Sequence, residues 1–567
     1  MMLPLPDTIS GSLDTPESIS YLHNMYNVGG ALVSREPMRT LFTQAYSGTG
    51  TPSTLSGVPD IHTHAQTEDG LGNNAEFRCA FVGRDGYLYT VLGDTVFRAI
   101  TSDEPSVRRS YLHYLVTSPS ILSSGNIEYA VGHTGVAMVT LAGKYFLNYA
   151  TQSVTELTDS DLPACVDVAY IGGRYVWLTA DGESIFWSEV DDAGNVSPLY
   201  FFDAEARPDK NRALSVIGED LFIFGQKSIQ RFRNIGGASQ PFINVPNSVI
   251  PIGYLSGFIE MSTKVAFVGR EEGGALGVYE MSGSSLNKIS SSVVDNILTE
   301  FIEKNEASTL EYASAGNSPV FIDIDLIRGI SYGSYGSSMY VFTTDSFSIY
   351  ARHTPGGYQW GFLSSDIKGG FSDGAEWHKR PLGKDYDPIG DVSYKPVFEC
   401  HYAVFYDRRW VLFCNDKEDG FAVAVYEKGK PMSANAFVDG GVAFSEGSTT
   451  YFDAPITRGL YLGLSDAAQR DTVFDSLEVS YSRRARGDYM TAVTGDSGDT
   501  LNMYLSLTGL SSTWSTAQTI SYGDKDESER IRYNFSGGLT PTNGCLQLAL
   551  ETSAEIPFTI TGLNANV

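Results

Sequence analysis

The sequence predicts an all-β protein, and three features indicate this fold class. Tyrosine, phenylalanine and glycine are abundant, with 33, 30 and 58 of the 567 residues, a composition typical of aromatic strands joined by tight turns. Short apolar runs alternate with turn dipeptides such as Asp85-Gly86, Gly172-Gly173 and Asp181-Gly182, which supply the positive φ that hairpins need. This arrangement of strands and turns returns about every 40–50 residues from residue 77 onwards.

Seven stretches share this arrangement, and each is a meander that cannot cover both of its apolar faces. Stacking the units around an axis would cover these faces, so we expect a β-propeller-like body over residues 77–440. A long irregular insert, 369–395, separates the sixth unit from the seventh and is expected to project as a loop. The seven units are 77–99, 127–150, 165–190, 213–234, 262–290, 336–353 and 401–427.

The two ends of the chain differ from this body. Residues 1–76 are polar and rich in turns, and we expect them to form an arm or connector rather than a core. Residues 441–567 alternate apolar and polar residues without the repeated unit, which predicts a C-terminal β-sandwich-like domain whose last strand pairs at a sheet edge.

One short helix is expected over residues 291–306. Its apolar residues Val294, Ile297, Leu298 and Phe301 follow the i, i+3, i+4, i+7 spacing of a helix face. Ser291 or Ser292 can cap its N-terminus.

Charge and cysteine content narrow the class of protein. A net charge of −28 argues against a protein that grips nucleic acid, because phosphate binding needs lysine and arginine. The five cysteines fit no metal or disulfide pattern, and we interpret them as reduced core residues of a protein assembled in a cytosol. We expect no signal peptide, no membrane anchor and no cofactor.

The segment DAEARPDKN, residues 203–211, contains three carboxylates that could carry chemistry: Asp203, Glu205 and Asp209. Two carboxylates about 5–10 Å apart could hydrolyse a glycosidic bond. The repeated box of sialidase-like propellers, however, is approached only at 179–187, and there Gly182 comes one place too early.

The alternative interpretation of this segment is a charged turn between two strands. Arg207 and Arg212 would then pair locally, and Pro208 would fix φ. Glu205 and Asp209 would accept hydrogen bonds from exposed backbone donors or from an arginine. We favour this interpretation and expect no catalytic residue here.

Candidate metal sites are equally weak. Asp60, His62 and His64 could form half of a zinc site, because an HxH pair on a strand puts both imidazoles on one face. The chain has only eight histidines and no alternation of strands and helices, so a surface loop is the better interpretation. Asp323 and Asp325 follow ordinary strand alternation, and 415–420 lacks calcium-loop spacing.

A cluster of arginines stands out in this acidic chain. Arg483, Arg484 and Arg486 could contact an acidic partner, or they could balance Asp475 and Glu478 nearby. Both possibilities stay open at the level of sequence.

The two runs 166–192 and 199–237, VDVAYIGGRYVWLTADGESIFWSEVDD and LYFFDAEARPDKNRALSVIGEDLFIFGQKSIQRFRNIGG, resemble the packaged-DNA stabilisation protein, or tail nozzle, of short-tailed bacteriophages. The resemblance is firm over about 165–300, with the departure that Gln230 stands where an acidic residue is expected. The residues that carry the motif are Ala204, Glu205, Pro208, Asp209, Phe224, Gly225, Ile229 and Phe232.

The resemblance implies a non-enzymatic virion protein of the short tail, assembled in the host cytoplasm. It implies a homo-oligomeric ring, a hexamer, that extends the channel of portal and tail adaptor, retains packaged double-stranded DNA and conducts it on ejection. A tail needle or plug and tailspikes or fibres are the further implied partners. An acidic conduit fits this role, because a basic one would bind phosphates along the passing DNA.

Two alternatives from other classes remain. One is a tail-associated glycan hydrolase or depolymerase that uses the carboxylates of 203–209. The other is a carbohydrate-binding adhesin that uses exposed aromatic residues such as Tyr332, Tyr335 and Trp377.

Overall fold

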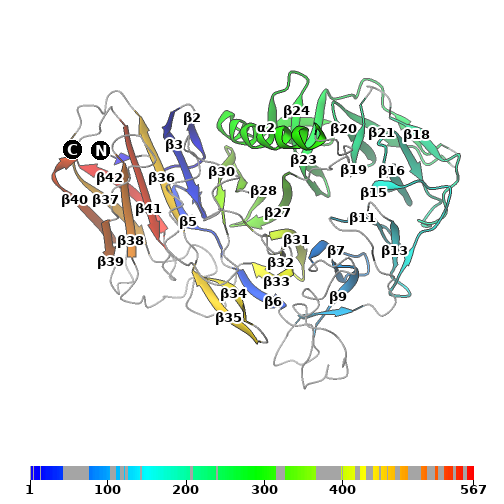
Figure 1. Cartoon of the computed structure of the whole chain (residues 1–567), viewed down its shortest axis with the longest axis horizontal. Helices are drawn as coiled ribbons and strands as arrows, with labels where there is room; N and C mark the ends of the chain where they lie inside the picture. Colours follow the sequence, from blue (N-terminus) through cyan, green and yellow to red (C-terminus); the bar gives the residue numbers. More distant parts are fainter. Residues whose placement is uncertain are drawn as a thin grey trace.

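A computed structural model gives the fold, in which a propeller and a sandwich lie side by side (Figure 1). No helix among the described residues is long and apolar enough to cross a membrane. The structure describes residues 2–3, 5–12, 15–36, 38–42, 76–101, 110–114, 121, 126–140, 143–204, 209–237, 240–314, 326–345, 347–364, 398, 400–415, 422–428, 438–445, 448–455, 458–465, 473–482, 500–506, 518–521, 529–539, 545–552 and 559–566.

Five antiparallel blades of four consecutive strands follow one another along the chain. Their first strands, β7, β11, β15, β19 and β23, lie nearest the propeller axis. The blades are β7 (Phe77–Val82), β8 (Leu88–Leu92), β9 (Thr95–Thr101) and β10 (Ser110–Tyr114); β11 (Glu128–Val131), β12 (Gly135–Val139), β13 (Lys144–Asn148) and β14 (Ser153–Glu156); β15 (Cys165–Ile171), β16 (Arg174–Thr179), β17 (Ser184–Trp187) and β18 (Phe201–Asp203); β19 (Asn211–Ile217), β20 (Asp220–Gly225), β21 (Ile229–Asn234) and β22 (Phe242–Asn244); β23 (Ile252–Met261), β24 (Lys264–Glu271), β25 (Leu276–Ser282) and β26 (Ser285–Lys288).

The sixth and seventh blades take strands from elsewhere in the chain. The sixth contains β27 (Arg328–Ser334), β28 (Ser337–Thr343), β29 (Ser348–Thr354) and β30 (Gly357–Leu363). The seventh contains β31 (Cys400–Tyr406), β32 (Arg409–Asn415) and β33 (Ala422–Lys428), and its fourth strand is β6 (Met38–Phe42). The number of blades therefore agrees with the seven units of the sequence, and the all-β, propeller-like fold class is confirmed.

The expectation of an N-terminal arm over residues 1–76 is wrong for the part that the structure describes. Residues 2–42 contribute six strands, and β6 pairs with β33 to complete the last blade. Tyr21 and Leu22 on β3 (Thr15–His23) are fully buried. The strands β4 (Met25–Val28) and β5 (Ala31–Ser34) are mostly buried, with the patterns of buried and half-buried residues expected of core strands.

The sandwich is built from both ends of the chain, which Figure 1 shows as blue strands beside orange and red ones. Leu22, Leu32, Leu460, Val479 and Leu563 pack together between its two sheets. One sheet contains β1 (Met2–Leu3), β4 (Met25–Val28), β5 (Ala31–Ser34), β42 (Thr559–Asn566), β37 (Phe474–Ser482) and β40 (Glu529–Leu539), and the other contains β2 (Ser10–Ser12), β3, β36 (Arg458–Ser465), β41 (Cys545–Thr552), β38 (Thr500–Ser506) and β39 (Gln518–Ser521). The hairpin β34 (Val438–Ser445) and β35 (Ser448–Pro455) pairs separately.

Propeller and sandwich share a sheet and a buried polar network. His23 at the end of β3 pairs with Phe362 of β30, so the second sandwich sheet continues the sixth blade. Asn24 Oδ1 accepts hydrogen bonds from the Ser364 amide at 2.9 Å and from Arg35 Nε at 3.1 Å. These buried groups hold the N-terminal strands against the propeller.

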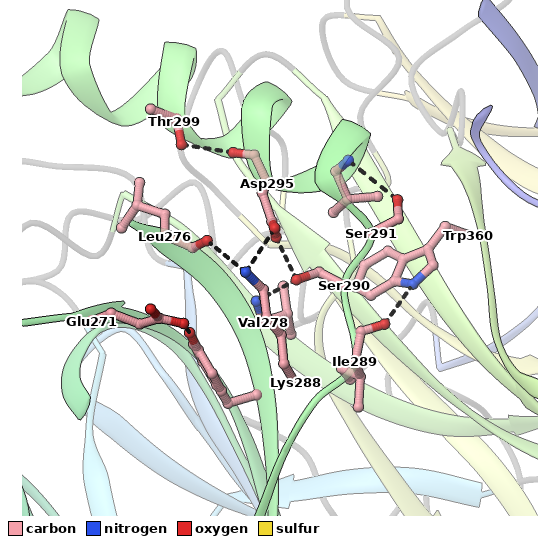
Figure 2. A network of polar contacts seen from close by, with 12 residues as sticks. Glu271, Leu276, Val278, Lys288, Ile289, Ser290, Ser291, Asp295, Thr299 and Trp360 are labelled. Carbon is pink, nitrogen blue, oxygen red and sulfur yellow. Dashed lines mark hydrogen bonds and ion pairs between the residues drawn. The ribbon is translucent and has the colours of Figure 1, made fainter. Parts of the chain in front are cut away.

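The helix α2 (Ser292–Ser314) is longer than the expected 291–306. Its first turn begins at the capping residue Ser291, whose Oγ accepts a hydrogen bond from the Val294 amide, and Figure 2 shows this cap. Asp295 pairs with Lys288 at 2.8 Å, where its charge favours the helix N-terminus. Trp360 Nε1 donates to the Ile289 carbonyl oxygen at 3.1 Å and ties this region to the sixth blade.

The turns and cysteines agree with their sequence patterns. Gly86, Gly172 and Gly182 adopt φ of 84°, 59° and 73°, as their hairpins require. Four cysteines, Cys79, Cys165, Cys400 and Cys414, are buried and form no disulfide with one another. The insert 369–395 lies outside the described residues.

Candidate functional site

The family-like motif forms a corner between the third and fourth blades. β18 ends at Asp203, and β19 begins the next blade at Asn211. Ala204 is buried, and its carbonyl oxygen accepts a hydrogen bond from Gln230 Nε2 at 2.8 Å. An unprotonated carboxylate at position 230 could not donate this bond. Glutamine at position 230, where an acidic residue is expected, therefore provides the donor for this hydrogen bond.

Asp209 caps the turn between β20 and β21. Its Oδ2 accepts hydrogen bonds from the amides of Lys227 at 2.7 Å and Ser228 at 3.1 Å. A Cβ atom on Gly225 would lie 2.5 Å from this oxygen, so glycine leaves room for the carboxylate. Asp209 and Gly225 therefore form one unit.

The apolar residues of the motif are buried on the strands that follow. Phe224 and Ile229 are 0% exposed, and Phe232 is 5% exposed. Phe232 packs on Phe202 of β18, with ring centroids 4.5 Å apart. These contacts seal the third blade against the fourth.

The corner does not gather its carboxylates around a reacting centre in the part that the structure describes. Asp203 accepts a hydrogen bond from Ser184 Oγ at 2.7 Å, while Asp209 faces the Lys227–Ser228 turn. Glu205, Arg207 and Pro208 lie outside the described residues.

The expected local pairing of Arg212 is wrong. Its Nη1 donates to the Leu255 carbonyl oxygen at 3.4 Å, and its side chain lines the propeller axis. Arg212 is the second residue of β19, and this position carries it toward the axis instead of the corner.

The remaining metal candidates and the arginine cluster fall largely outside the described residues. This holds for Asp60, His62, His64, Asp323, Asp325, Arg483, Arg484, Arg486 and 416–420. Within the described part of the chain, no three histidine, cysteine, aspartate or glutamate residues are grouped as a metal site. Glu478, one proposed counter-charge for the arginines, pairs with Arg530 at 3.2 Å.

The aromatic residues suggested for an adhesin are not an exposed platform. Tyr332 is only 4% exposed, because it lies in the core between the sixth and seventh blades. Tyr335 is partly buried and donates its hydroxyl hydrogen to the Ser34 carbonyl oxygen at 2.7 Å. Trp377 lies outside the described residues.

A cavity of about 250 Å³ lies on the propeller axis, and the inner strand of every blade contributes to its wall. This volume equals a cube about 6 Å on a side, whereas the major groove alone of a DNA duplex is about 12 Å wide. The polar residues that line it are Asn126, Glu128, Tyr129, Asp167, Arg212, Tyr254, Glu260, Arg328, Ser331, His401 and Tyr402.

Several of these polar groups are held by neighbouring blades. Asp167 accepts hydrogen bonds from the Leu214 amide at 2.6 Å and from its neighbour Val168 at 2.7 Å. The Tyr402 hydroxyl lies 2.6 Å from the Arg78 carbonyl oxygen and 2.8 Å from Asn126 Oδ1. The cavity wall is therefore stiffened by bonds between blades.

Two titratable groups of the cavity are shifted toward their neutral forms. Glu260 lies deep in the propeller with its side chain open to the cavity, and burial raises the pKa of this carboxyl. It accepts a hydrogen bond from Ser215 Oγ at 2.6 Å. Burial, and then the charge of Arg328, hold the pKa of His401 well below its ordinary value.

We missed this cavity in the sequence, although a signal was present. If the repeats are aligned by their turns, Glu128, Asp167, Arg212, Arg328 and His401 all fall within the first three residues of an inner strand. Charged residues at this position are unusual for buried strands, which are normally continuous apolar runs.

The sequence of residues 76–326 matches a family of phage stabilisation proteins, described as bacteriophage P22 Gp10, beta-propeller. The match begins directly before β7 and ends between α2 and β27, so it spans five blades and the helix. The resemblance expected from the sequence is confirmed over these residues. No curated protein matches the chain.

Three solved structures show weaker likenesses. PorZ, a surface component of the type-IX secretion system of Porphyromonas gingivalis, is 9% identical with a TM-score of 0.34; the match covers 71% of this chain and 43% of PorZ. The N-terminal domain of Nup159 is 8% identical with a TM-score of 0.33 (69% and 95% covered), and the AfRom2 CNH domain is 12% identical with a TM-score of 0.23 (48% and 79% covered). This chain thus spans less than half of PorZ.

Proposed function

Because residues 76–326 carry the propeller of the phage stabilisation family, we propose that this chain is a structural protein of a bacteriophage virion that serves as its tail nozzle. The observation that carries the proposal is the match over five consecutive blades and the helix α2. The nozzle would extend the portal–adaptor channel, retain the packaged genome and conduct it on ejection.

The size of the axial cavity decides where the DNA would pass. At about 250 Å³ it is far too small for a duplex, so one propeller is not the conduit. The channel of a nozzle must then lie between several copies of the chain, which supports a ring. We propose a hexamer, as the family resemblance implies.

The charge of the chain supports a conduit that does not hold its cargo. With 67 acidic and 39 basic residues, the protein repels phosphates instead of releasing their counterions by binding them. DNA would pass without sequence-specific contacts. The adaptor, a needle or plug, and tailspikes or fibres are the partners we propose for such a ring.

Electron microscopy of the purified chain, alone and mixed with tail components, tests this proposal. We expect closed rings with an axial hole at least as wide as a duplex, and we expect the adaptor to bind at one end. Particles that stay single under both conditions would contradict the nozzle.

The competing hydrolase is tested by the paired substitution Glu205→Gln and Asp209→Asn. If the corner were catalytic, the pair would abolish glycan hydrolysis while the protein stayed folded. Since Asp209 already accepts two backbone hydrogen bonds, we expect the pair to change stability or assembly only. Any glycan turnover by the native chain that the pair removes would overturn the non-enzymatic proposal.

A further inference from the structure

Two arginines that line the axial cavity have no described carboxylate partner. Arg212 is the second residue of β19, and Arg328 is the first residue of β27. The one side-chain hydrogen bond of Arg212 to another described residue is a long one, 3.4 Å, to the Leu255 carbonyl oxygen. Arg328 Nε is buried and has no hydrogen-bond acceptor among the residues that the structure describes. Buried donors of this kind are rare in folded proteins, and each one calls for a physical reason.

The absence of an ion pair within the described part of the chain is notable because carboxylates are plentiful in this protein. Acidic residues outnumber basic ones by 67 to 39. By contrast, Arg231 and Arg233 in the fourth blade both pair with Asp220. The fourth blade therefore pairs these two arginines with a carboxylate, whereas Arg212 and Arg328 line the cavity without such a pair among the described residues.

The acidic residues of the cavity wall do not take the place of a partner. Both carboxylate oxygens of Asp167 accept backbone hydrogen bonds, from Val168 and Leu214. The Glu260 carboxylate accepts hydrogen bonds from Ser215 Oγ at 2.6 Å and from the amide of Val216 at 3.4 Å. Glu128 also lines the wall and makes contacts of its own.

His401 adds a neutral donor to the same wall. Asn415 Nδ2 can only donate, so at 2.7 Å it donates to His401 Nδ1. The proton of the neutral imidazole then resides on Nε2, which makes this nitrogen a hydrogen-bond donor. Two guanidinium groups and an imidazole N–H are a donor set that suits an oxyanion.

We propose that the axial cavity binds a small oxyanion through Arg212 and Arg328. The shared chemistry is that of a phosphate or a carboxylate group, which matches the planar fork of a guanidinium. A cavity of about 250 Å³ suits a small ligand and not a polymer, so the ligand is a free anion or the anionic end of a small molecule. This site does not depend on the proposed function of the chain.

Isothermal titration of the purified full-length chain tests the site. Inorganic phosphate and acetate are titrated separately in a low-salt buffer that contains neither. Tighter binding of phosphate assigns the site to phosphates, and tighter binding of acetate assigns it to carboxylates. Absence of binding by both anions overturns the proposal.

Single substitutions connect the binding to the two arginines. Arg212→Gln and Arg328→Gln should each raise the dissociation constant of the anion by roughly ten-fold or more, since each removes a charged donor. Arg530→Gln is the matched control, because this residue lies on the sandwich strand β40 with 72% of its side chain exposed. Equal affinity in all three variants would overturn the site.

A second pair of variants keeps the test decisive if the glutamine variants do not fold. Arg212→Lys and Arg328→Lys retain the charge but lose the fork. We expect these to fold and to bind the anion measurably more weakly than the native chain. Native affinity in both lysine variants would show that the guanidinium groups do not form the site.

Discussion

Two joins in the propeller use the same device at very different chain separations. At the corner between the third and fourth blades, Asp209 accepts hydrogen bonds from the amides of Lys227 and Ser228, fewer than 20 residues away. At the seam between the last and first blades, Asn415 accepts from the Phe77 amide at 2.8 Å and donates to its carbonyl oxygen at 2.9 Å, across 338 residues.

The difference teaches where a ring of blades is vulnerable. The corner forms within one stretch of chain, so its loop-closure cost is small, whereas the seam must close almost the whole propeller. The seam is reinforced by Phe77 and Phe413, whose rings lie 5.2 Å apart, and by β6 on the outer edge of the last blade. Interactions at the seam should therefore matter more than similar ones at the corner.

The largest effect is expected at the seam. Asn415→Ala leaves the buried amide and carbonyl groups of Phe77 without partners, which should lower the free energy of unfolding of the propeller by about 2–4 kcal/mol. Urea unfolding followed by tryptophan fluorescence measures this change. The exposed Asn287→Ala on β26 is the control and should stay near native. A seam variant as stable as this control would remove the contrast between the two joins.

A smaller effect is expected at the corner, where the effects of substituting Gly225 and Asp209 should depend on each other. Gly225→Ala should cost about 1–3 kcal/mol, because its Cβ would lie 2.5 Å from Asp209 Oδ2. Asp209→Ala should cost a similar amount through the lost amide hydrogen bonds. In the double variant the clash with the carboxylate is gone, although the Cβ still lies 3.1 Å from the Ser228 carbonyl oxygen, so we expect the total to fall below the sum by about 1 kcal/mol.

Gly273→Ala provides the control for this cycle. No atom of another described residue, its chain neighbours aside, lies within 4 Å of the position of its Cβ, so its alanine variant should be close to native. Strict additivity of the two corner variants in the same urea titration would mean that the carboxylate and the glycine are independent.

Gln230, which stands where an acidic residue is expected, is the next residue whose role can be tested. Gln230→Glu places a carboxylate 2.8 Å from the Ala204 carbonyl oxygen, where Nε2 now donates. We expect a loss of about 1–2 kcal/mol at neutral pH and partial recovery in acid, since a protonated carboxyl can donate again. Unfolding midpoints measured at pH 7 and pH 4 check both parts; equal losses at the two pH values would argue against this bond.

The smallest effects are changes in stability with pH. They should have opposite signs for two glutamates of the fifth blade. Burial alone would raise the pKa of Glu280, but hydrogen bonds from Lys264, Tyr340 and Tyr358 hold it below its ordinary 4.5. Its stabilisation is present above pH 4.5 and is lost as the pH falls through the lowered value. Glu260 behaves oppositely, because burial raises its pKa and its ionised form weakens the fold as the pH rises above 4.5.

Glutamine variants separate these slopes. Relative to the native chain, Glu280→Gln should be less stable at pH 7 by about 1 kcal/mol, with the gap closing toward pH 3. The Glu260→Gln variant should become more stable relative to the native chain as the pH rises. Unfolding midpoints measured from pH 3 to pH 7 show whether the two stability differences change in opposite directions. If both variants follow the same pH dependence, these assignments are contradicted.

The sequence predicted those parts of the fold that are local in the chain. Hairpin turns such as Asp85-Gly86 and Asp181-Gly182 mark blades whose strands follow one another, and the capping serine marks the start of α2. The strand β6 was not predictable, because its partner β33 lies almost 400 residues later and β pairing over such distances leaves no local pattern.

The candidate sites divide in the same way. Asp209 and Gly225 belong to the motif that carries the resemblance, and the role of Asp209 in a charged turn could be anticipated from the carboxylates and the proline of 203–211. The axial cavity could not, since it combines one to four residues from each of seven strands, and Arg212 seemed to belong to the charged turn beside it. Convergence at an axis depends on the closure of the ring, which no single repeat encodes.

The pairing of β5 with β42 has a consequence for biosynthesis. Leu32 and Val33 find their neighbours Ile560 and Thr559 only after more than 500 further residues have been translated. β5 must therefore wait, kept from aggregating, while the intervening blades assemble. A message truncated before the codon of Thr559 would yield a polypeptide in which β5 lacks its partner strand.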